Sequence, residues 1–233
     1  MHPWLKISKQ KIGNILFPVY FKRRSELEYW KERKQIEDKL NNTHFRYFFT
    51  IQFGLVEADY TDKRIIDIGC GPRGSLEWAI TARERIGLDP LAHRYSKISP
   101  PTQGMQYIKG RVESIPFPDK HFDVVSSFNS LDHVENIGLA VQEIARVTRL
   151  GGWFLLLTDV GHIPTLCEPN NLSWSIVKEF QVFFDVIVES HYERIPSGIY
   201  QSIQSGIPYD HKNRTQRPGV LSVKFLRKPE CRS

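Results

Sequence analysis

The sequence is poor in cysteine and has no long apolar runs, and each absence excludes a class of protein. Its 233 residues include three cysteines, Cys70, Cys167 and Cys231, which are far apart and form no C-x-x-C pattern. They predict neither a disulfide framework nor a zinc site, and they fit a reducing compartment. The longest apolar runs, such as WFLLL at 153–157, are too short to cross a bilayer. We therefore expect no integral membrane segment.

The first two dozen residues also lack the features of a secretory signal. They mix lysines with apolar residues and contain neither a continuous apolar core nor a small-residue cleavage site. From this absence, together with the cysteine pattern, we expect a cytoplasmic location.

The positive charge of the chain is concentrated at one end. The formal net charge is +6, and residues 1–46 hold 11 Lys/Arg against 5 Asp/Glu, whereas the remainder holds 21 of each. A basic segment of this kind attracts an anionic surface, a nucleic acid or an acidic substrate, or it forms a solvated helix face. It contains no aromatic-basic RNA-binding motif, so a nucleic-acid partner is the weaker interpretation.

The central part of the chain alternates between short apolar strands and amphipathic helices. The strands expected there span 64–69, 86–89, 105–110, 122–128 and 151–160, and the helices span 74–85 and 136–149. This α/β alternation predicts a mostly parallel sheet with helices on both faces.

The two flanks differ from this pattern. Helical periodicity at 23–40 and 43–58 predicts an N-terminal helical cap, residues 1–60, before a second domain of residues 61–233. After a helix at 172–183, the last strands are expected at 184–190 and 220–228, as an antiparallel pair at the sheet edge. The residues between these strands, 191–219, form a long excursion without a clear pattern, and such loops are often functional.

A glycine-rich turn follows the first strand in RIIDIGCGPRG. Gly69, Gly71 and Gly74 have the spacing G-x-G-x-x-G, which lets the backbone approach a ligand. In a dinucleotide site the pyrophosphate binds the N-terminus of the next helix, but Asp67 would repel it. A ligand with an ammonium and a sulfonium group would be attracted instead. Asp89 suits a carboxylate that accepts the ribose hydroxyls of either ligand.

Several motifs in order are similar to those of class I S-adenosylmethionine-dependent methyltransferases that act on small molecules. They are IIDIGCGPRG, IGLDP (86–90), YIKGRVESIPFPDKHFDVVSSFNSLDHV (107–134) and RVTRLGGWFLLL (146–157). The resemblance implies a Rossmann-like fold with a mostly parallel seven-stranded sheet and an antiparallel edge strand. It also implies S-adenosyl-L-methionine as the cofactor.

The resemblance further implies a set of cofactor-binding residues that follow successive strands. They are Asp67, Gly69, Cys70, Gly71, Asp89, Pro90, Leu91, Arg111, Val112, Glu113, Asn129 and Ser130. Asp67 would border the methionine part, Asp89 the ribose, and Asn129 the sulfonium. Arg111 stands where many relatives have an aspartate, and an arginine accepts no hydrogen bond from adenine. Glu113 or a backbone carbonyl would have to replace that contact.

Candidates for catalysis and acceptor binding follow the fourth and later strands. His133 has an unperturbed pKa of roughly 6.5, which suits a general base, and Asp132 either caps the next helix or contacts the acceptor. Asp159 and His162, with Glu168, are expected at the same edge of the sheet. Their spacing matches no established metal pattern, so we expect acceptor recognition or loop structure there and no metal. In the excursion at 191–219, the aromatic candidates for acceptor binding are Tyr192 and Tyr200.

The sequence thus favours transfer of a methyl group from S-adenosylmethionine to oxygen or nitrogen of a small-molecule or glycan-type acceptor. Two other hypotheses stay open at this point. One is an NAD-dependent oxidoreductase that uses the same glycine turn, and the other is a cofactor-binding module without catalysis, which the unusual Arg111 favours. The acceptor, the methylated atom and the oligomeric state do not follow from the sequence.

Overall fold

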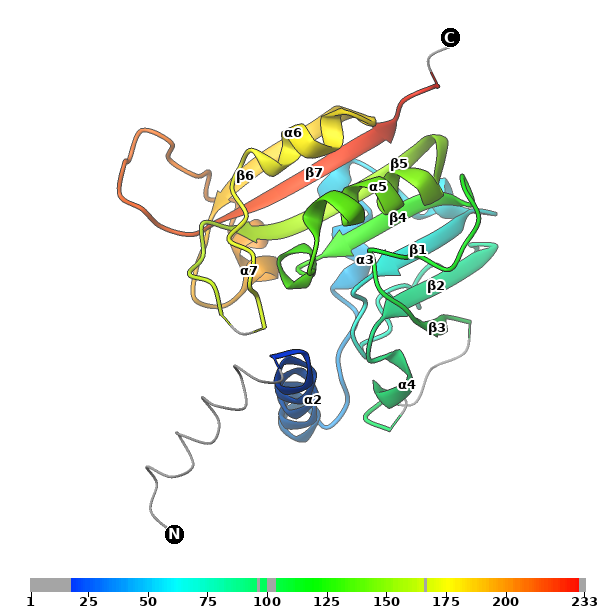
Figure 1. Ribbon diagram of the computed structural model, residues 1–233, viewed down its shortest axis with the longest axis horizontal. Helices are drawn as coiled ribbons and strands as arrows, with labels where there is room; N and C mark the ends of the chain where they lie inside the picture. Colours follow the sequence, from blue (N-terminus) through cyan, green and yellow to red (C-terminus); the bar gives the residue numbers. More distant parts are fainter. Residues whose placement is uncertain (1–17, 96, 100–103, 166, 231–233) are drawn as a thin grey trace.

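The computed structural model describes residues 18–95, 97–99, 104–165 and 167–230; Cys231 and the first 17 residues of the predicted cap lie outside these ranges. Seven strands form one sheet in the order β3-β2-β1-β4-β5-β7-β6 (Figure 1). The strands are β1 (Arg64–Ile68), β2 (Glu84–Asp89), β3 (Gln106–Lys109), β4 (Phe122–Phe128), β5 (Thr148–Val160), β6 (Phe184–Glu193) and β7 (Gly219–Arg227). The predicted α/β fold is confirmed.

The direction of the strands places several loops at one edge of the sheet. β1 to β5 are mutually parallel, and β7 runs antiparallel to both β5 and β6. The antiparallel strand β7 therefore lies one position in from the edge, between β5 and β6, and β6 forms the edge of the sheet. The pairing sets Ile68 opposite Leu88 and Ser127, so β1, β2 and β4 end at the same level. Open α/β sheets bind their ligands at this carboxyl edge.

One face of the sheet is covered by α5 (Ile137–Val147) and α6 (Ile176–Gln181) (Figure 1). The side chain of Asn136 caps α5 by accepting a hydrogen bond from the Leu139 N–H. Phe154 of β5 is fully buried on this face, where its ring contacts those of Phe180 and Phe225. Full burial of such a side chain stabilises the fold by about 1.5–3 kcal/mol.

The other face is covered by short helical pieces from both ends of the chain. They are α3 (Phe45–Phe49), η1 (Ile51–Phe53), η2 (Glu57–Tyr60) and α7 (Ile199–Ser205). The helix predicted at 43–58 is thus broken, because Gly54 adopts a left-handed conformation with φ 64°. Phe49 packs on Phe128 of β4, with ring centroids 4.5 Å apart. This aromatic segment therefore belongs to the core of the sheet.

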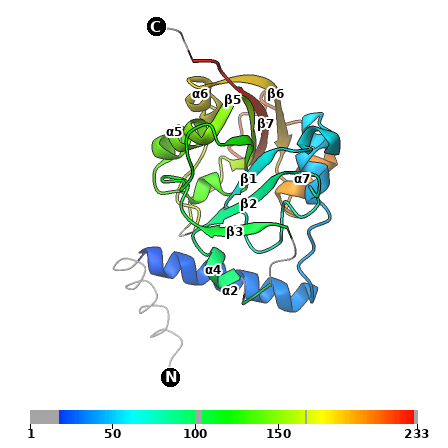
Figure 2. The same cartoon turned by 90° about the vertical axis from the view of Figure 1, so that its right-hand side faces the viewer.

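The long helix α2 (Pro18–Glu37) lies apart from both layers. It crosses the molecule below β3 and α4 (Ala92–Tyr95), as Figure 2 shows. Leu27 on its inner side packs with Leu91 and Tyr95, which follow β2. The predicted cap is therefore two structures, a core layer and a separate helix.

The helix predicted at 74–85 is wrong. Residues 75–83 form successive turns, with hydrogen bonds from Glu77 N to Gly74 O and from Ala79 N to Leu76 O. The reason is length, because β2 already begins at Glu84 and leaves too few residues after the glycine turn for a helix and its connections. Leu76 and Ala79 are still buried, so the apolar pattern reflects packing rather than helical periodicity.

The predicted long excursion is also shorter than expected. β6 continues to Glu193, α7 follows, and β7 begins at Gly219, so the irregular part is reduced mainly to residues 206–218. Arg217 closes this loop by pairing with Glu193. The pattern was hidden because β6 carries polar residues beyond its apolar start.

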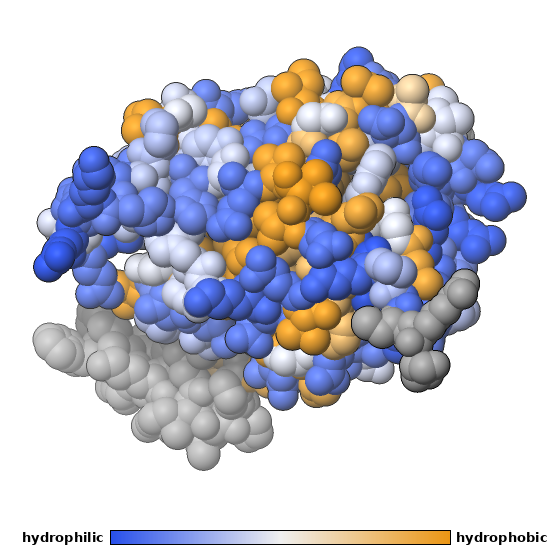
Figure 3. All heavy atoms as spheres, turned by 90° about the horizontal axis from the view of Figure 1, so that it is seen from above, coloured by the Kyte–Doolittle hydropathy of each residue, from blue (hydrophilic) through white to orange (hydrophobic). Residues whose placement is uncertain are grey.

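The face seen in Figure 3 carries a band of apolar side chains bordered by polar ones, on the side of α6 and β6. Exposed apolar residues of this region include Val182, Ile187 and Val188. Asp185 and Glu189 lie among them on β6, and charged side chains discourage an edge strand from pairing with another chain. Within the described ranges, we find no helix with both the length and the apolar character of a membrane span.

Candidate active site

A cavity of about 1020 Å³ opens at the carboxyl edge of the sheet, beneath α2. All the residues that the resemblance implied for the cofactor line it: Asp67, Gly69, Cys70, Gly71, Asp89, Pro90, Leu91, Arg111, Val112, Glu113, Asn129 and Ser130. Small-molecule sites typically enclose about 300–1,000 Å³. The cavity is therefore large enough for a cofactor together with part of an acceptor.

The glycine turn passes through a space that admits no side chain. Gly69 and Gly71 have φ angles of 69° and 56°, in the left-handed region. A Cβ atom on Gly69 would overlap Ser130, which follows β4. A Cβ on Gly71 would lie 3.0 Å from the ring of Trp30 on α2. These glycines let the backbone border the cavity directly.

Asp67 is buried at the end of β1, with 3% of its surface exposed. Its Oδ1 accepts a hydrogen bond from the Ser126 hydroxyl at 2.7 Å, and its Oδ2 accepts one from the Ser75 hydroxyl. Burial raises the pKa of Asp67 to about 6, although these two hydroxyls favour the ionised form. A cation bound in the cavity would favour ionisation further.

Asp89 is positioned by the backbone on both sides. Its Oδ1 accepts from the Leu91 N–H at 2.7 Å and its Oδ2 from the Gly71 N–H at 3.3 Å. Burial raises the pKa of Asp89 to about 6. The Tyr95 hydroxyl also donates to this carboxylate, so three of its roughly four lone pairs have donors and one remains for a ligand hydroxyl. This arrangement fits one hydroxyl of a ribose.

The side chain of Asn129 has a carbonyl oxygen that receives no hydrogen bond from the part of the chain that the structure describes. Asn129 follows β4 with φ 54°, and its buried Oδ1 has no hydrogen-bond partner among the described residues. A buried carbonyl oxygen without a partner costs roughly 1–3 kcal/mol, and a ligand N–H would remove that cost. Asn129 therefore fits a ligand that carries a hydrogen-bond donor, as the predicted cofactor does.

Arg111 and Glu113 interact with each other and with the start of α5. Arg111 pairs with Glu135 at 2.6 Å and with Glu113 at 3.4 Å. Glu113 Oε1 also accepts from the backbone N–H groups of Glu135 and Asn136. Both side chains line the cavity, but their polar atoms are largely occupied by these contacts. A direct contact between Glu113 and adenine stays a prediction.

The predicted catalytic residues lie in the short helix η3 (Leu131–His133), next to the loop that carries Glu168. His133 Nε2 is 3.8 Å from Asp132 Oδ1 and 3.9 Å from Glu168 Oε1. Lys22 of α2 donates a hydrogen bond to the His133 carbonyl. Asp132 is buried, which raises its pKa to about 7, and the nearby Glu168 contributes to the rise. Burial lowers the pKa of His133, which favours the neutral imidazole.

His162 faces the same group from the end of β5. Its Nε2 lies 3.6 Å from Asp132 Oδ2, and this buried nitrogen has no hydrogen-bond partner among the described residues. Its Nδ1 lies 3.1 Å from the Ile163 carbonyl oxygen. Asp132, His133 and Glu168 have donor atoms within 4.8 Å of one another, a set that is chemically able to hold a metal ion.

The other predicted acceptor residues occupy different places. Asp159 pairs with Arg194, whose Nε lies 2.8 Å from Oδ1, and Arg194 itself lines the cavity. Tyr200 of α7 lines the cavity. The Tyr192 hydroxyl accepts a hydrogen bond from the Gln52 side chain at 3.0 Å, on the face of the sheet that α3 and η1 cover. Acceptor binding by these residues stays a prediction.

Sequence reasoning missed the residues that α2 contributes. Glu26 lines the cavity, and its carboxylate accepts a hydrogen bond from the Trp30 indole N–H at 2.9 Å. Burial raises the pKa of Glu26. The sequence offered one signal for this role, because Glu26 lies four residues before Trp30 and next to Leu27 on the predicted helix. Nothing in the spacing connects α2 with the glycine turn, so only the fold could show that they meet.

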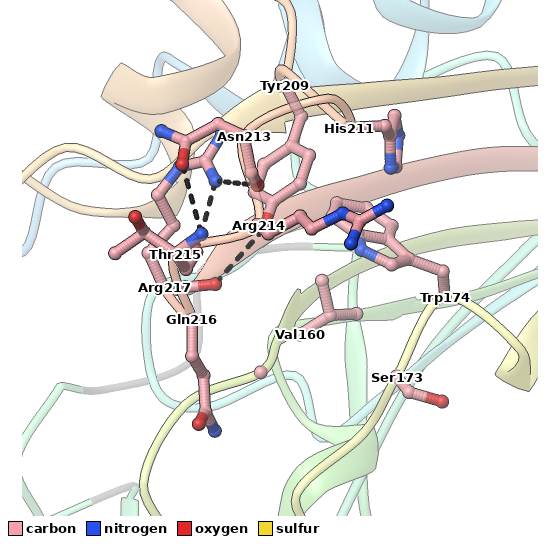
Figure 4. Close-up of a pocket in the computed structure, with 11 residues that line it drawn as sticks. Val160, Ser173, Trp174, Tyr209, His211, Asn213, Arg214, Thr215, Gln216 and Arg217 are labelled. Carbon is pink, nitrogen blue, oxygen red and sulfur yellow. Dashed lines mark hydrogen bonds between the residues drawn. The ribbon is translucent and has the colours of Figure 1, made fainter.

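A second hollow of about 290 Å³ lies beside the end of β5, away from this cavity (Figure 4). Trp174 forms one wall and stacks on His191, with ring centroids 4.1 Å apart. Arg217 lies over the ring of Tyr209 and donates to Glu193, so its charge is neutralised within the protein. Most residues of the segment 209–217 border this hollow.

Comparison with known proteins supports the resemblance. Residues 66–156 match the family described as "Methyltransferase domain". The uncharacterized methyltransferase YcgJ of Bacillus subtilis (strain 168) is 29% identical over 140 residues, which make up 53% of this chain and 55% of that protein. A fatty-acid O-methyltransferase of Mycolicibacterium smegmatis is 31% identical over 127 residues, 51% of this chain and 44% of that protein. The chain spans about half the length of these curated relatives.

A solved structure shows the same fold. The S-adenosylmethionine-dependent methyltransferase from Mesorhizobium loti superimposes with a TM-score of 0.54 at 17% identity, and the match covers 72% of this chain and 92% of that chain. The ordered sequence motifs, the sheet and the matched domain agree with one another. Residues 66–156 therefore match a methyltransferase domain, and they lie in a sheet whose fold this S-adenosylmethionine-dependent methyltransferase shares.

Proposed function

We propose that this protein transfers the methyl group of S-adenosylmethionine to an oxygen or nitrogen atom of a small-molecule or glycan-type acceptor. The observation that carries the proposal is one cavity, lined by the glycine turn, Asp67 and Asp89, that continues to His133 and Glu168. The fatty-acid O-methyltransferase among the relatives supports an acceptor oxygen. Free thiols at Cys70 and Cys167 support the cytoplasmic location that we include in this proposal.

Electrostatics favours this cofactor over a dinucleotide. The buried Asp67 and Asp89 and the half-buried Glu26 bring three carboxyl groups to one cavity. Like charges a few ångströms apart repel by at least about 1 kcal/mol even in a solvated setting, so a pyrophosphate is disfavoured here. Residues 75–83 form turns, so the glycine turn also offers no helix N-terminus to a pyrophosphate. Both features argue against the oxidoreductase alternative.

The residues at the two ends of the cavity divide the task. When bound, S-adenosylmethionine would supply a methyl carbon on a sulfonium leaving group. Asp89 holds the ribose and Asp67 the positively charged end, which aligns donor and acceptor. The proton of an acceptor hydroxyl passes to His133, the predicted base. Asp132 and Glu168 flank that imidazole and would stabilise its charged form.

Helix α2 excludes water from this reaction. Trp30 and Glu26 of α2 line the side of the cavity opposite the sheet edge, and Gly71 lies against the tryptophan ring. Removing α2 would leave the cofactor residues open to solvent, which weakens every electrostatic contact inside. We therefore assign the predicted cap of residues 1–60 a covering role through α2.

The decisive experiment measures cofactor choice and then product formation. Calorimetry should show saturable binding of S-adenosylhomocysteine and none of NADH. Incubation of the full chain with isotopically labelled S-adenosylmethionine and cell extract should then give a labelled product heavier by one methyl group in mass spectrometry. Binding of NADH alone would support the oxidoreductase, and cofactor binding without any labelled product would support the non-catalytic module.

A further inference from the structure

Buried polar atoms around Asp132 face one another without forming hydrogen bonds. Asp132 Oδ1 lies 3.8 Å from His133 Nε2, and Asp132 Oδ2 lies 3.6 Å from His162 Nε2. Both distances exceed those of hydrogen bonds. Asp132 has 1% of its surface exposed, and its Oδ1 has no partner among the described residues. A nearby cation would stabilise a buried carboxyl oxygen that has no hydrogen-bond partner.

The position of His162 adds a second buried group without a partner. Its Nδ1 lies 3.1 Å from the Ile163 carbonyl oxygen, which is able only to accept a hydrogen bond. Its buried Nε2 faces Asp132 Oδ2 at 3.6 Å and has no hydrogen-bond partner among the described residues. Two buried polar groups at this end of the cavity thus lack partners within the described part of the chain.

We propose that Asp132, His133 and Glu168 bind a divalent metal ion, and that His162 supports the site through the second oxygen of Asp132. The three ligand atoms lie within 4.8 Å of one another. A point equally distant from all three is about 2.5 Å or less from each, close to the bond lengths of divalent ions. A small rotation of the side chains would complete the contacts.

The kind of ion follows from the ligands. One imidazole and two carboxylates suit ions that accept both nitrogen and oxygen, so we assign Zn²⁺ or Mn²⁺ rather than Mg²⁺. Three protein ligands leave a position open, as in catalytic metal sites. His133 and Glu168 line the cavity, so the open position is accessible from it.

The ammonium group of Lys22 does not occupy the proposed metal position. Lys22 directs its ammonium group to the His133 carbonyl oxygen, not to the carboxylate of Asp132. The three carboxyl groups of this end, Asp132, Glu168 and the nearby Glu26, thus leave room for a divalent charge.

This inference rests on the proposed function and assigns a substrate class to it. The ion would bind an acceptor hydroxyl at its open coordination position and lower the pKa of that hydroxyl. The hydroxyl proton would then leave to water, and the hydroxyl oxygen would attack the methyl carbon. His133 then serves as a ligand instead of a free base. The acceptor class is an alcohol or phenol that presents its oxygen to the ion.

Metal binding is tested without any acceptor. The full chain is stripped with EDTA, dialysed, and titrated by calorimetry with Zn²⁺, Mn²⁺ and Mg²⁺ in separate runs. We expect one equivalent of Zn²⁺ or Mn²⁺ and much weaker binding of Mg²⁺. Asp132→Asn and Glu168→Gln should each weaken binding at least tenfold, and His162→Gln by about tenfold. Glu168 is partly exposed, so its variant remains informative if Asp132→Asn does not fold.

The control is a separate imidazole–carboxylate group, formed by His191, His211 and Glu189. His191→Gln should leave the stoichiometry and affinity unchanged. The proposal is overturned if no ion binds saturably, if Asp132→Asn binds as tightly as the parent chain, or if His191→Gln abolishes binding. Binding of S-adenosylhomocysteine to the stripped chain separates these results from a failure of the proposed function.

Discussion

The guanidinium of Arg73 meets the carboxylate of Glu37 at two points, with Nη1 2.7 Å from Oε2 and Nη2 2.6 Å from Oε1. Arg73 belongs to the glycine turn and Glu37 ends α2. The same guanidinium lies 5.3 Å from the ring centroid of Trp30. One side chain of the cofactor loop therefore fastens the covering helix in two ways.

Arg73→Ala should weaken binding of S-adenosylhomocysteine about tenfold, because α2 is no longer held over the cavity. Glu37→Gln should have a smaller effect, and a double-mutant cycle should give a coupling of about 1 kcal/mol, as for a partly exposed two-point pair. Calorimetry measures both. The exposed pair of Lys31 and Glu28 on the same helix supplies the control, because Lys31→Ala should not change affinity. Zero coupling would show that the contact does not hold α2 closed.

Asp89→Ala should weaken cofactor binding by roughly 1–3 kcal/mol, because a charged hydrogen bond to the ribose is lost. The dissociation constant of S-adenosylhomocysteine measures this change. Asp185→Ala, on the exposed edge strand, removes the same charge from the surface and should leave affinity unchanged. If Asp89→Ala bound the cofactor like the parent chain, the ribose assignment would be wrong.

The raised pKa values of Asp67 and Asp89 make stability depend on pH. Each folded pKa is about 6, whereas the unfolded value is 3.8. Between these values the folded chain binds more protons than the unfolded chain, so the free energy of unfolding falls as pH rises. The loss is about 3 kcal/mol for each carboxyl group and is nearly complete by about pH 7.

Urea unfolding of the unliganded chain at pH 4.5 and pH 7 measures this loss. Asp67→Asn should reduce the difference between the two pH values, because one of the two groups no longer ionises. S-adenosylmethionine should bind more tightly at pH 7 than at pH 5, since its positive charge favours the ionised carboxylates. If the free energy of unfolding changed equally between the two pH values in the parent and in Asp67→Asn, groups other than Asp67 would cause the pH dependence.

His133→Ala should lower turnover about a hundredfold once an acceptor is in hand. The residue is needed in either role, as a base or as a metal ligand. Affinity for S-adenosylhomocysteine should stay within about threefold, since His133 lies at the acceptor end. Steady-state kinetics and calorimetry separate the two effects, and the exposed His211→Ala is the control. Turnover within a fewfold of the parent would reduce His133 to a structural residue.

The part of the fold that local pattern determines was predictable from the sequence. Strands such as 64–69 and 122–128 were found because continuous β-branched and apolar residues are typical of strands buried on both faces. The segment at 74–85 misled the prediction, because its apolar spacing suits a helix while the early start of β2 leaves no room for one. Chain length between strands is a tertiary constraint, which a local pattern does not contain.

The candidate site shows the same division. The meeting of Asp67, Asp89 and Asn129 at one cavity was predictable, because they lie at or just after the ends of parallel strands and these strands end at a common edge. Glu26 and Trp30 were not, since the crossing of α2 over the glycine turn depends on packing between distant segments. The contact between Asp132 and His162 was likewise hidden, because η3 and the end of β5 meet only in the folded sheet.

Gly69→Ala tests the close approach on which the cavity depends. The substitution introduces strain at φ 69° and also an overlap with Ser130. Gly54→Ala is a matched control, because Gly54 has φ 64° but no atom within 4 Å of the added Cβ. The control should lose about 1–2 kcal/mol of stability and keep its affinity for S-adenosylhomocysteine. Gly69→Ala should lose more stability and at least tenfold in affinity, and adding Ser130→Gly should restore part of both. If the two alanine variants behave alike, backbone strain alone explains the conformation, and the packing of the glycine turn against Ser130 does not shape the cavity.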